Sequence, residues 1–290
     1  QTTTRRWTTG GGWLRRKTYH VQQTITEGRK DYYTHTLRAD NPVKISILTP
    51  GESAGSVEIN SGGAVQINQG ITNASSIDIS TTESGSDISI DSLQVKGSSV
   101  PINLVSAGNL NLQVGGTDAS TDAIALSAAA AGDLTIQTFQ RDGVAANLRP
   151  IVQQNSSPAL SSANGSITLN LAGGLDTSAR STDSNQSLIT AQRIEISAGT
   201  GSIDNLIVDS SINGLTPSSG IAARTVESGG SIELTEAEGD LQLITPSSYS
   251  SDQAISSSAN VSLSVSSGNL LDGTGEAINP INTAALERMD

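Results

Sequence analysis

The chain has 290 residues, a formal net charge of −12, no cysteine and an aromatic content of only 2 %. The lack of cysteine excludes a disulfide framework and any metal site with cysteine ligands. So few aromatic residues exclude an ordinary globular core built on Phe, Tyr and Trp, and leave either a disordered polar chain or a repetitive all-β stack.

Basic and aromatic residues are concentrated at the start of the chain. Residues 1–38 hold eight basic and two acidic residues, whereas the remainder holds eight basic and 26 acidic residues. Five of the seven aromatic residues also fall in this segment. Two β-rich runs, 18–26 and 32–37, flank a turn at 27–31 that contains a glycine, which is typical of a β-hairpin. We therefore predict a basic, aromatic β-hairpin extension over residues 1–38.

From residue 43 to residue 265 the chain repeats short segments in which aliphatic residues alternate with polar ones. Successive side chains of a strand point to opposite faces, so each segment predicts a short, half-buried strand. Neighbouring segments often start eight to twelve residues apart. Examples are Val57/Ile59, Val65/Ile67, Ile77/Ile79, Ile232/Leu234 and Leu241/Leu243.

Evenly spaced short strands occur in sandwiches, barrels and solenoids. Here the strands are very short, their connectors are small residues, and one motif recurs: Ser-Ala-Gly-Asn-Leu-Asn-Leu at 106–112, Ala-Ala-Gly-Asp-Leu-Thr-Ile at 130–136 and Glu-Gly-Asp-Leu-Gln-Leu at 238–243. These features favour an all-β solenoid over residues 39–275. Each coil of roughly 20–29 residues would rest on the previous one about 4.8 Å away, with aliphatic side chains inside.

The period fails at 137–163, 172–190 and 209–226, which we expect to leave the coil as loops. In the tail, residues 276–290, Thr283 precedes good helix formers as an N-cap residue does, so we predict a short helix or a link to a next segment. The chain starts without Met or a signal peptide, and we interpret Gln1 as the edge of a piece of a longer protein.

The repeated motif resembles filamentous haemagglutinin-type bacterial exoproteins, which are secreted with the help of a partner protein. The matching stretches are 106–112, Gly-Ser-Ile-Thr-Leu-Asn-Leu-Ala-Gly-Gly at 165–174 and Ser-Gly-Asn-Leu-Leu-Asp-Gly at 267–273. The basic segment at 1–38 is similar to basic, Thr-rich excursions in that family. The resemblance implies a right-handed parallel β-helix, export through an outer-membrane secretion partner, and a place between adjacent β-helix segments of an adhesin or stalk.

Some parallel β-helices degrade polysaccharides, which requires acids clustered in a groove or a basic residue that abstracts a proton. The acids that could serve are Asp78/Asp87/Asp91, Asp118/Asp122 and Asp176/Asp183. However, Asp also caps turns and keeps a rod solvated, lysine is nearly absent after residue 38, and aromatic sugar platforms are missing. We therefore predict that the chain is not an enzyme.

Metal binding has little support in the sequence. The acidic body would suit calcium, but the glycine- and aspartate-rich nonapeptide repeat of calcium-binding rolls does not occur. His20 and His35 fall on facing arms of the predicted hairpin but lack a third ligand. We predict no metal and no cofactor.

The best candidate for binding is the basic start, where positive charge is interleaved with aromatic stacking surface. Its alternative is structural: the rings pack on the rod and the charges face its acidic body. We predict glycan or anion binding there, with no nucleic-acid partner. The residues are Arg5, Arg6, Trp7, Trp13, Arg15, Arg16 and Lys17.

Together these features predict a structural or adhesive segment of a large secreted bacterial surface protein, acting as a rigid stalk with a cell-surface receptor or glycan as partner. Two alternatives remain: a polysaccharide-degrading β-helix enzyme and a phage tailspike-like protein.

Overall fold

The structure is a computed structural model. It describes the backbone of four outlying strands and most of the chain between residues 56 and 274. The described ranges are 2–7, 19–24, 43–46, 56–69, 74–95, 100–116, 123–141, 143–152, 158–178, 186–251, 253–274 and 281–286. In these ranges the protein is all-β and contains no helix.

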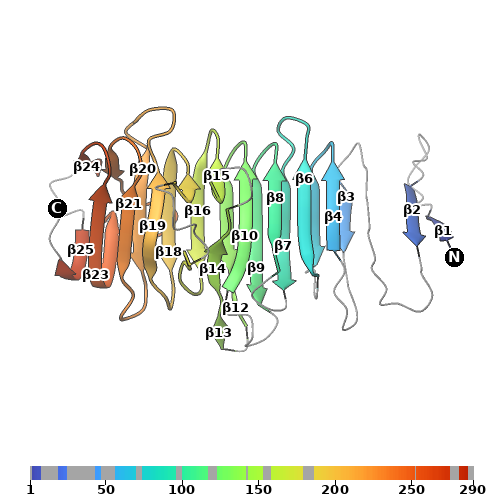
Figure 1. The fold of residues 1–290 in the computed structure, drawn as a ribbon, viewed down its shortest axis with the longest axis horizontal. Coiled ribbons are helices and arrows are strands. Elements are labelled where there is room, and N and C mark those ends of the chain that lie inside the picture. The colour runs from blue at the N-terminus through green and yellow to red at the C-terminus, as the bar shows by residue number, and fades with distance from the viewer. Residues whose placement is uncertain are drawn as a thin grey trace.

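The described strands are short and follow one another along a rod (Figure 1). They are β1 (Thr2–Trp7), β2 (Tyr19–Thr24), β3 (Val43–Ser46), β4 (Ser56–Ser61), β5 (Val65–Gln69), β6 (Ser76–Thr81), β7 (Ile88–Val95), β8 (Ile102–Ser106), β9 (Leu110–Gly116), β10 (Ala123–Ala130), β11 (Leu134–Thr138), β12 (Gln140–Arg141), β13 (Val144–Ala145), β14 (Asn147–Pro150), β15 (Leu160–Ser162), β16 (Ser166–Leu171), β17 (Ile189–Thr190), β18 (Arg193–Ala198), β19 (Ile203–Asp209), β20 (Gly220–Thr225), β21 (Ile232–Glu236), β22 (Leu241–Leu243), β23 (Ile255–Val265), β24 (Leu270–Asp272) and β25 (Ile281–Leu286).

Two long parallel ladders confirm the predicted β-solenoid. The first ladder runs β4, β6, β8, β10, β15, β17, β19, β21, β23. The second ladder runs β3, β5, β7, β9, β11, β16, β18, β20, β22, β24. Paired residues are 20 positions apart between Val57 and Ile77 and 29 apart between Leu234 and Leu263, within the predicted coil length. The coil from Ala128 to Leu160 is longer, at 32, and that from Ile189 to Val208 is shorter, at 19.

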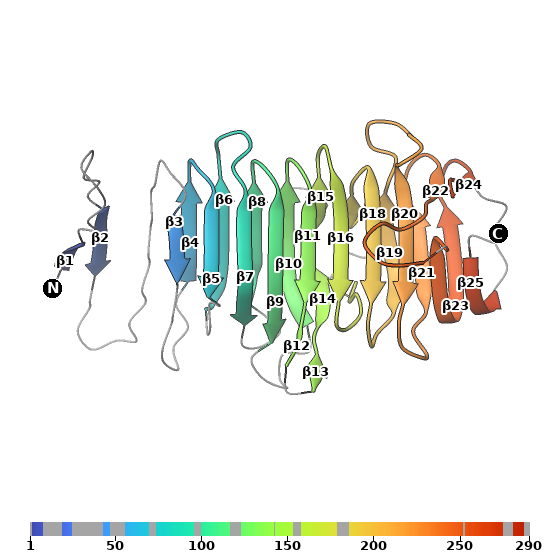
Figure 2. The same ribbon diagram turned by 180° about the vertical axis from the view of Figure 1, so that it is seen from behind.

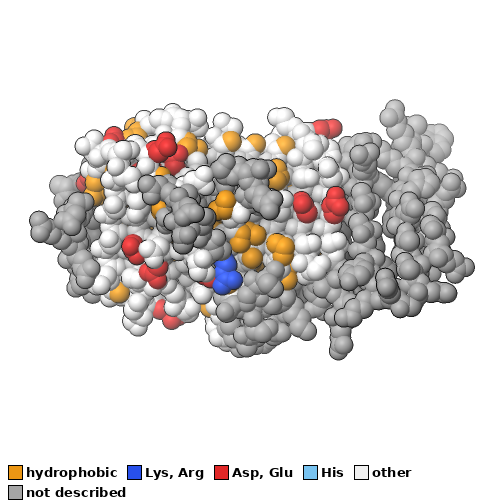
Figure 3. All heavy atoms as spheres, viewed as in Figure 1, with side chains coloured by type: hydrophobic (Ala, Val, Ile, Leu, Met, Phe, Trp, Pro, Cys, Tyr) orange, Lys and Arg blue, Asp and Glu red, His pale blue; other side chains and the backbone are white. Residues whose placement is uncertain are grey.

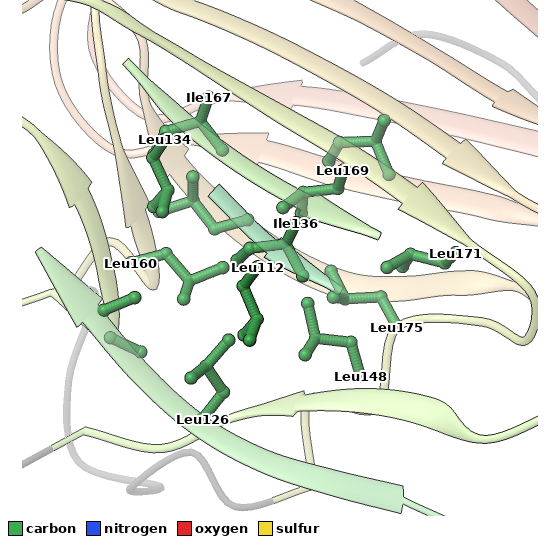
Figure 4. Close-up of a cluster of buried hydrophobic side chains, with 14 of the residues drawn as sticks. Leu112, Leu126, Leu134, Ile136, Leu148, Leu160, Ile167, Leu169, Leu171 and Leu175 are labelled. Carbon is green, nitrogen blue, oxygen red and sulfur yellow. The ribbon is translucent and has the colours of Figure 1, made fainter. Parts of the chain in front are cut away.

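The interior is aliphatic because the alternation predicted from the sequence sets which side chains face inward. β4 shows it directly, with Val57, Ile59 and Ser61 buried and the residues between them exposed or half-buried. Figure 4 shows leucines and isoleucines of successive coils meeting inside the rod. Because equivalent side chains stack on one another, each coil covers the apolar face of the next and stabilises it.

The recurring Gly-Asn or Gly-Asp pair forms a hydrogen-bonded corner. Asp87 Oδ1 accepts a hydrogen bond from Asn109 N at 2.6 Å, and Asn109 Oδ1 accepts one from Asp133 N at 2.9 Å. A Cβ atom at Gly132 would lie 2.3 Å from Asn109 Oδ1. The glycine is therefore required because the side-chain oxygen of the coil before occupies its side-chain space.

Two predictions about the ends have different outcomes. β2 pairs in antiparallel fashion with β1, whereas the second arm of the predicted hairpin, 32–37, lies outside the described residues. The predicted C-terminal helix is not found at Ile281–Leu286, which form β25 and pair in parallel with β23. Without β25, the backbone groups at that edge of β23 would lack strand partners. The hydrogen bonds of this pairing outweigh a weak local helix preference.

The predicted loops are only partly loops. Within 137–163, β12 and β13 form an antiparallel hairpin outside the coil, but β14 and β15 pair with β10. Within 209–226, β20 belongs to the second ladder. Alternation is hidden in β20 because both Ala222 and Ala223 are buried. The right-handed winding and the boundaries at residues 38 and 275 stay predictions.

Candidate functional site

The predicted basic site cannot be located as a set. Arg5, Arg6 and Trp7 lie on β1, opposite Val21, His20 and Tyr19 of β2, and their side chains are not described. Trp13, Arg15, Arg16, Lys17 and His35 lie outside the described residues. Glycan or anion binding by this segment stays a prediction.

The predicted acid groups do not come together in the described part of the rod. Asp78 accepts a hydrogen bond from Asn103, Asp87 holds the corner at Asn109, and Asp91 pairs with Ser89 on its own strand. Asp118, Asp122 and Asp183 lie outside the described residues. Asp176 lines a concave surface.

That surface is a groove of about 400 Å³ where neighbouring coils join through single bridges rather than continuous strands. The bridges link Leu148 to Leu175 and Leu175 to Ile203. Glycines allow the backbones to approach closely there, since a Cβ atom at Gly174 would lie 2.6 Å from the carbonyl oxygen of Ser202. The lining residues are Asn147, Gly174, Leu175, Asp176, Thr177, Ser178, Gly201, Ser202, Asp204 and Asn205.

The bridges place charged residues of successive coils in one row on the outer surface. Arg149, Asp176 and Asp204 each follow a bridged residue, and Glu233 follows Ile232, the partner of Ile203. We call Asp176, Asp204 and Glu233 the acidic row. Neighbouring strands of a sheet lie about 4.8 Å apart, so the carboxylates of this row come from adjacent rungs.

Arg149 neutralises the end of the acidic row. Its Nε lies 2.6 Å from Asp176 Oδ2, and both side chains are half-buried. Burial alone would raise the pKa of Asp176, but hydrogen bonds from Ser178 and the guanidinium of Arg149 outweigh it and hold the pKa below the ordinary value. Asp176 is therefore a fixed carboxylate, suited to accept hydrogen bonds and poorly suited to act as a general acid.

The floor of the groove is irregular next to Asp204. The register between β19 and β21 shifts between Ile203 and Leu206, and Asn205 has a left-handed backbone with φ of 51°. Asn tolerates that conformation better than most residues. The bulge leaves Asn205 exposed on the groove, while Ser231 Oγ donates to Asp204 Oδ1 at 2.6 Å.

A second polar cluster lies on the outer face of β18 and β20, under the segment that leads from β22 to β23. We call residues 244–251 the strap, which crosses this face in Figure 2. Glu195 is fully covered and accepts hydrogen bonds from Ser247 N, Ser247 Oγ and Ser248 N. Burial alone would raise the pKa of Glu195, but the hydrogen bonds from Ser248 and Ser247 lower it to about 2.

Arginines complete the attachment of the strap. Arg193 donates to Glu195 at 2.6 Å and to the carbonyl oxygen of Thr245 at 2.7 Å. The guanidinium of Arg224 lies 4.1 Å from the centre of the Tyr249 ring, a cation–π contact. The carboxylate and guanidinium groups of this cluster are bonded within the chain, whereas the buried hydroxyl of Tyr249 has no hydrogen-bond partner. The cluster therefore holds the strap against the outer face of the coil.

The three arginines whose side chains are described, Arg149, Arg193 and Arg224, thus all have partners within the chain. On the face in Figure 3, acidic side chains are spread along the rod and basic ones are scarce. Among the described residues, no group of three or more His, Asp or Glu side chains is arranged to hold a metal ion, and no helix is long and apolar enough to cross a membrane.

Comparison of the chain with protein-family models, curated protein sequences and solved structures gives no match. The similarity to haemagglutinin-type exoproteins therefore rests on the repeated motif and the basic segment at 1–38.

The sequence did contain a signal for the groove, but grouping acids by short separations in the sequence did not find it. Arg149, Asp176 and Asp204 are separated by 27 and 28 residues, one coil length each. Residues one coil apart lie side by side in a solenoid, which local spacing does not consider: it selected Asp176 with Asp183, and Asp183 lies outside the described residues.

Proposed function

We propose that this chain is a rigid structural and adhesive segment of a large secreted bacterial surface protein, not an enzyme. The observation that carries the proposal is the aliphatic stack, which continues from Ile59 on β4 to Val208 on β19 without a polar interruption. Coils that each rest on their neighbours give a stiff, quasi-one-dimensional rod that suits a spacer between a cell surface and its target.

We assign surface contact to the groove beside Arg149. It offers fixed carboxylate, amide and hydroxyl groups but, among its described lining residues, no aromatic ring. Such a surface suits a hydroxyl-rich ligand such as a cell-surface glycan, bound through hydrogen bonds. The right-handed winding, the outer-membrane secretion partner and the bacterial cell-surface location belong to the same proposal, supported by the repeated motif.

The test measures binding of the purified chain to immobilised cell-surface polysaccharides. The double variant Asp176→Asn/Asp204→Asn should lose most of the binding. The control Glu58→Gln/Asp78→Asn removes two exposed acids from β4 and β6 and should bind normally. Equal binding by the unmodified chain and both double variants would exclude the groove as the binding site. A chain lacking residues 1–38 would then show whether the basic segment binds instead.

Polysaccharide cleavage is a second candidate, favoured only by the adjacent rungs of Asp176 and Asp204. Glycosidases place two carboxyl groups roughly 5–10 Å apart around the scissile bond. Release of reducing ends from an acidic polysaccharide, lost in Asp204→Asn, would support cleavage over adhesion. Nothing in the described residues favours the phage tailspike-like alternative.

A further inference from the structure

One carboxyl group interrupts the inward stack of the first ladder. The stacked residues are Ile59, Ile79, Leu104, Ala128, Leu160, Ile189, Val208, Glu236 and Val265. Glu236 thus sits between two valines in a stack that is otherwise aliphatic, and its exposed fraction is 0 %. A buried carboxylate is costly unless it is paired with a charge or neutralised by a proton.

Glu236 has hydrogen bonds but forms no ion pair with any described residue. Ser210, which is itself fully buried, donates from its backbone N at 2.9 Å and pairs through its hydroxyl at 2.7 Å. The serine hydroxyl can donate to a carboxylate or accept from a carboxylic acid, so it satisfies either form.

The charged groups on β21, on its ladder neighbours β19 and β23 and in the turn after β21 are all acidic, and Arg224 on the adjoining β20 contacts the Tyr249 ring and Ser197 instead. β19 carries Asp204 and Asp209, β21 carries Glu233, the turn after it carries Glu238 and Asp240, and β23 carries none. Burial raises the pKa of Glu236 to about 7, and the charge of Asp209 adds to this, although the Ser210 hydrogen bonds act in the opposite direction.

We propose that Glu236 is a pH-sensitive latch for the last coils: as a carboxylic acid it keeps the corner between β19 and β21 closed, and as a carboxylate it loosens that corner. The folded state holds the proton more tightly than the opened state. The closed corner is therefore most stable at mildly acidic pH and weakens as the pH rises through 7.

The size of the effect follows from the two pKa values. With about 7 for the closed corner and 4.5 for an exposed glutamate, the opening constant rises on the order of 70-fold between pH 5 and pH 8. The serine and valine side chains next to Glu236 do not titrate in this range.

Hydrogen–deuterium exchange of the whole chain tests the latch, with rates corrected for intrinsic exchange. Amides of residues 206–211 and 232–237 should exchange at least tenfold faster at pH 8 than at pH 5. Glu236→Gln, which imitates the uncharged acid, should abolish this rise. The control Glu238→Gln, an exposed glutamate two residues away, should retain it. A pH-independent corrected rate in the unmodified chain, or an equal rise in Glu236→Gln, would overturn the proposal.

A direct titration covers the case in which opening is too rare to detect. The ¹³C shift of the Glu236 carboxyl carbon should titrate with a midpoint above pH 6. A midpoint near 4.5 would show that the side chain is not held in the interior and would refute the latch whatever the exchange rates are.

Discussion

The coils from β4 to β11 and those from β18 to β23 use the same ladders but are stabilised differently. The earlier coils hold an aliphatic interior and hydrogen-bonded Asx corners, and their outward side chains stay in solvent. The later coils bury two glutamates, one outside the sheet under the strap and one inside the stack. The comparison teaches that a stack of coils tolerates a buried carboxyl group where one coil, or a segment beyond it, supplies the hydrogen bonds.

The largest effect is expected in the earlier coils. Leu104→Ala removes a fully buried side chain from between Ile79 and Ala128, and should lower the free energy of unfolding by about 3 kcal/mol because packed neighbours cannot fill the cavity. Val105→Ala, one residue along and 42 % exposed, is the matched control and should change it by less than about 0.5 kcal/mol. Chemical denaturation measures both, and similar losses would contradict the assigned facing of β8.

In the later coils, Glu195→Gln should lower the free energy of unfolding by about 2 kcal/mol at pH 7, because an amide cannot accept all the bonds from Ser247 and Ser248. The pKa of Glu195 is depressed to about 2, so its contribution is complete above pH 4.5 and is lost as the pH falls from 4.5 towards 2. The variant and the unmodified chain should therefore converge near pH 2. A difference that persists there would show that the glutamate acts through packing rather than charge.

The smallest effect is expected where the two regions meet. Arg149→Gln breaks a partly exposed ion pair with Asp176 and should change the free energy of unfolding by less than about 1 kcal/mol. If the groove binds a polar ligand, the same variant should weaken binding several-fold. A large loss of stability without any change in binding would reassign Arg149 to a structural role.

The parallel stack could be predicted from the sequence because the two-residue alternation and the Gly-Asn or Gly-Asp corner are local signals repeated in each coil. Glu195 could not be placed: alternation puts it outside the sheet, and only the strap, about 50 residues later, buries it. The inward position of Glu236 did have a local signal, since Ile232, Leu234 and Glu236 alternate inward. The free-energy cost of burying its carboxyl group, however, depends on neighbours from other coils. The predicted C-terminal helix was wrong for the opposite reason. Helix preference is a local signal, whereas the pairing of β25 with β23 depends on residues far away in the sequence.

The distance between two labelled coils tests the central claim most directly, and the cysteine-free chain makes labelling specific. Spin labels at Glu58→Cys and Thr235→Cys would lie beside Ile59 and Glu236, which are seven rungs apart in the first ladder. Double electron–electron resonance should give a single distance distribution centred at about 34 Å, from rungs stacked at about 4.8 Å. A main distance below about 20 Å, or no defined distance, would contradict the parallel stack of coils.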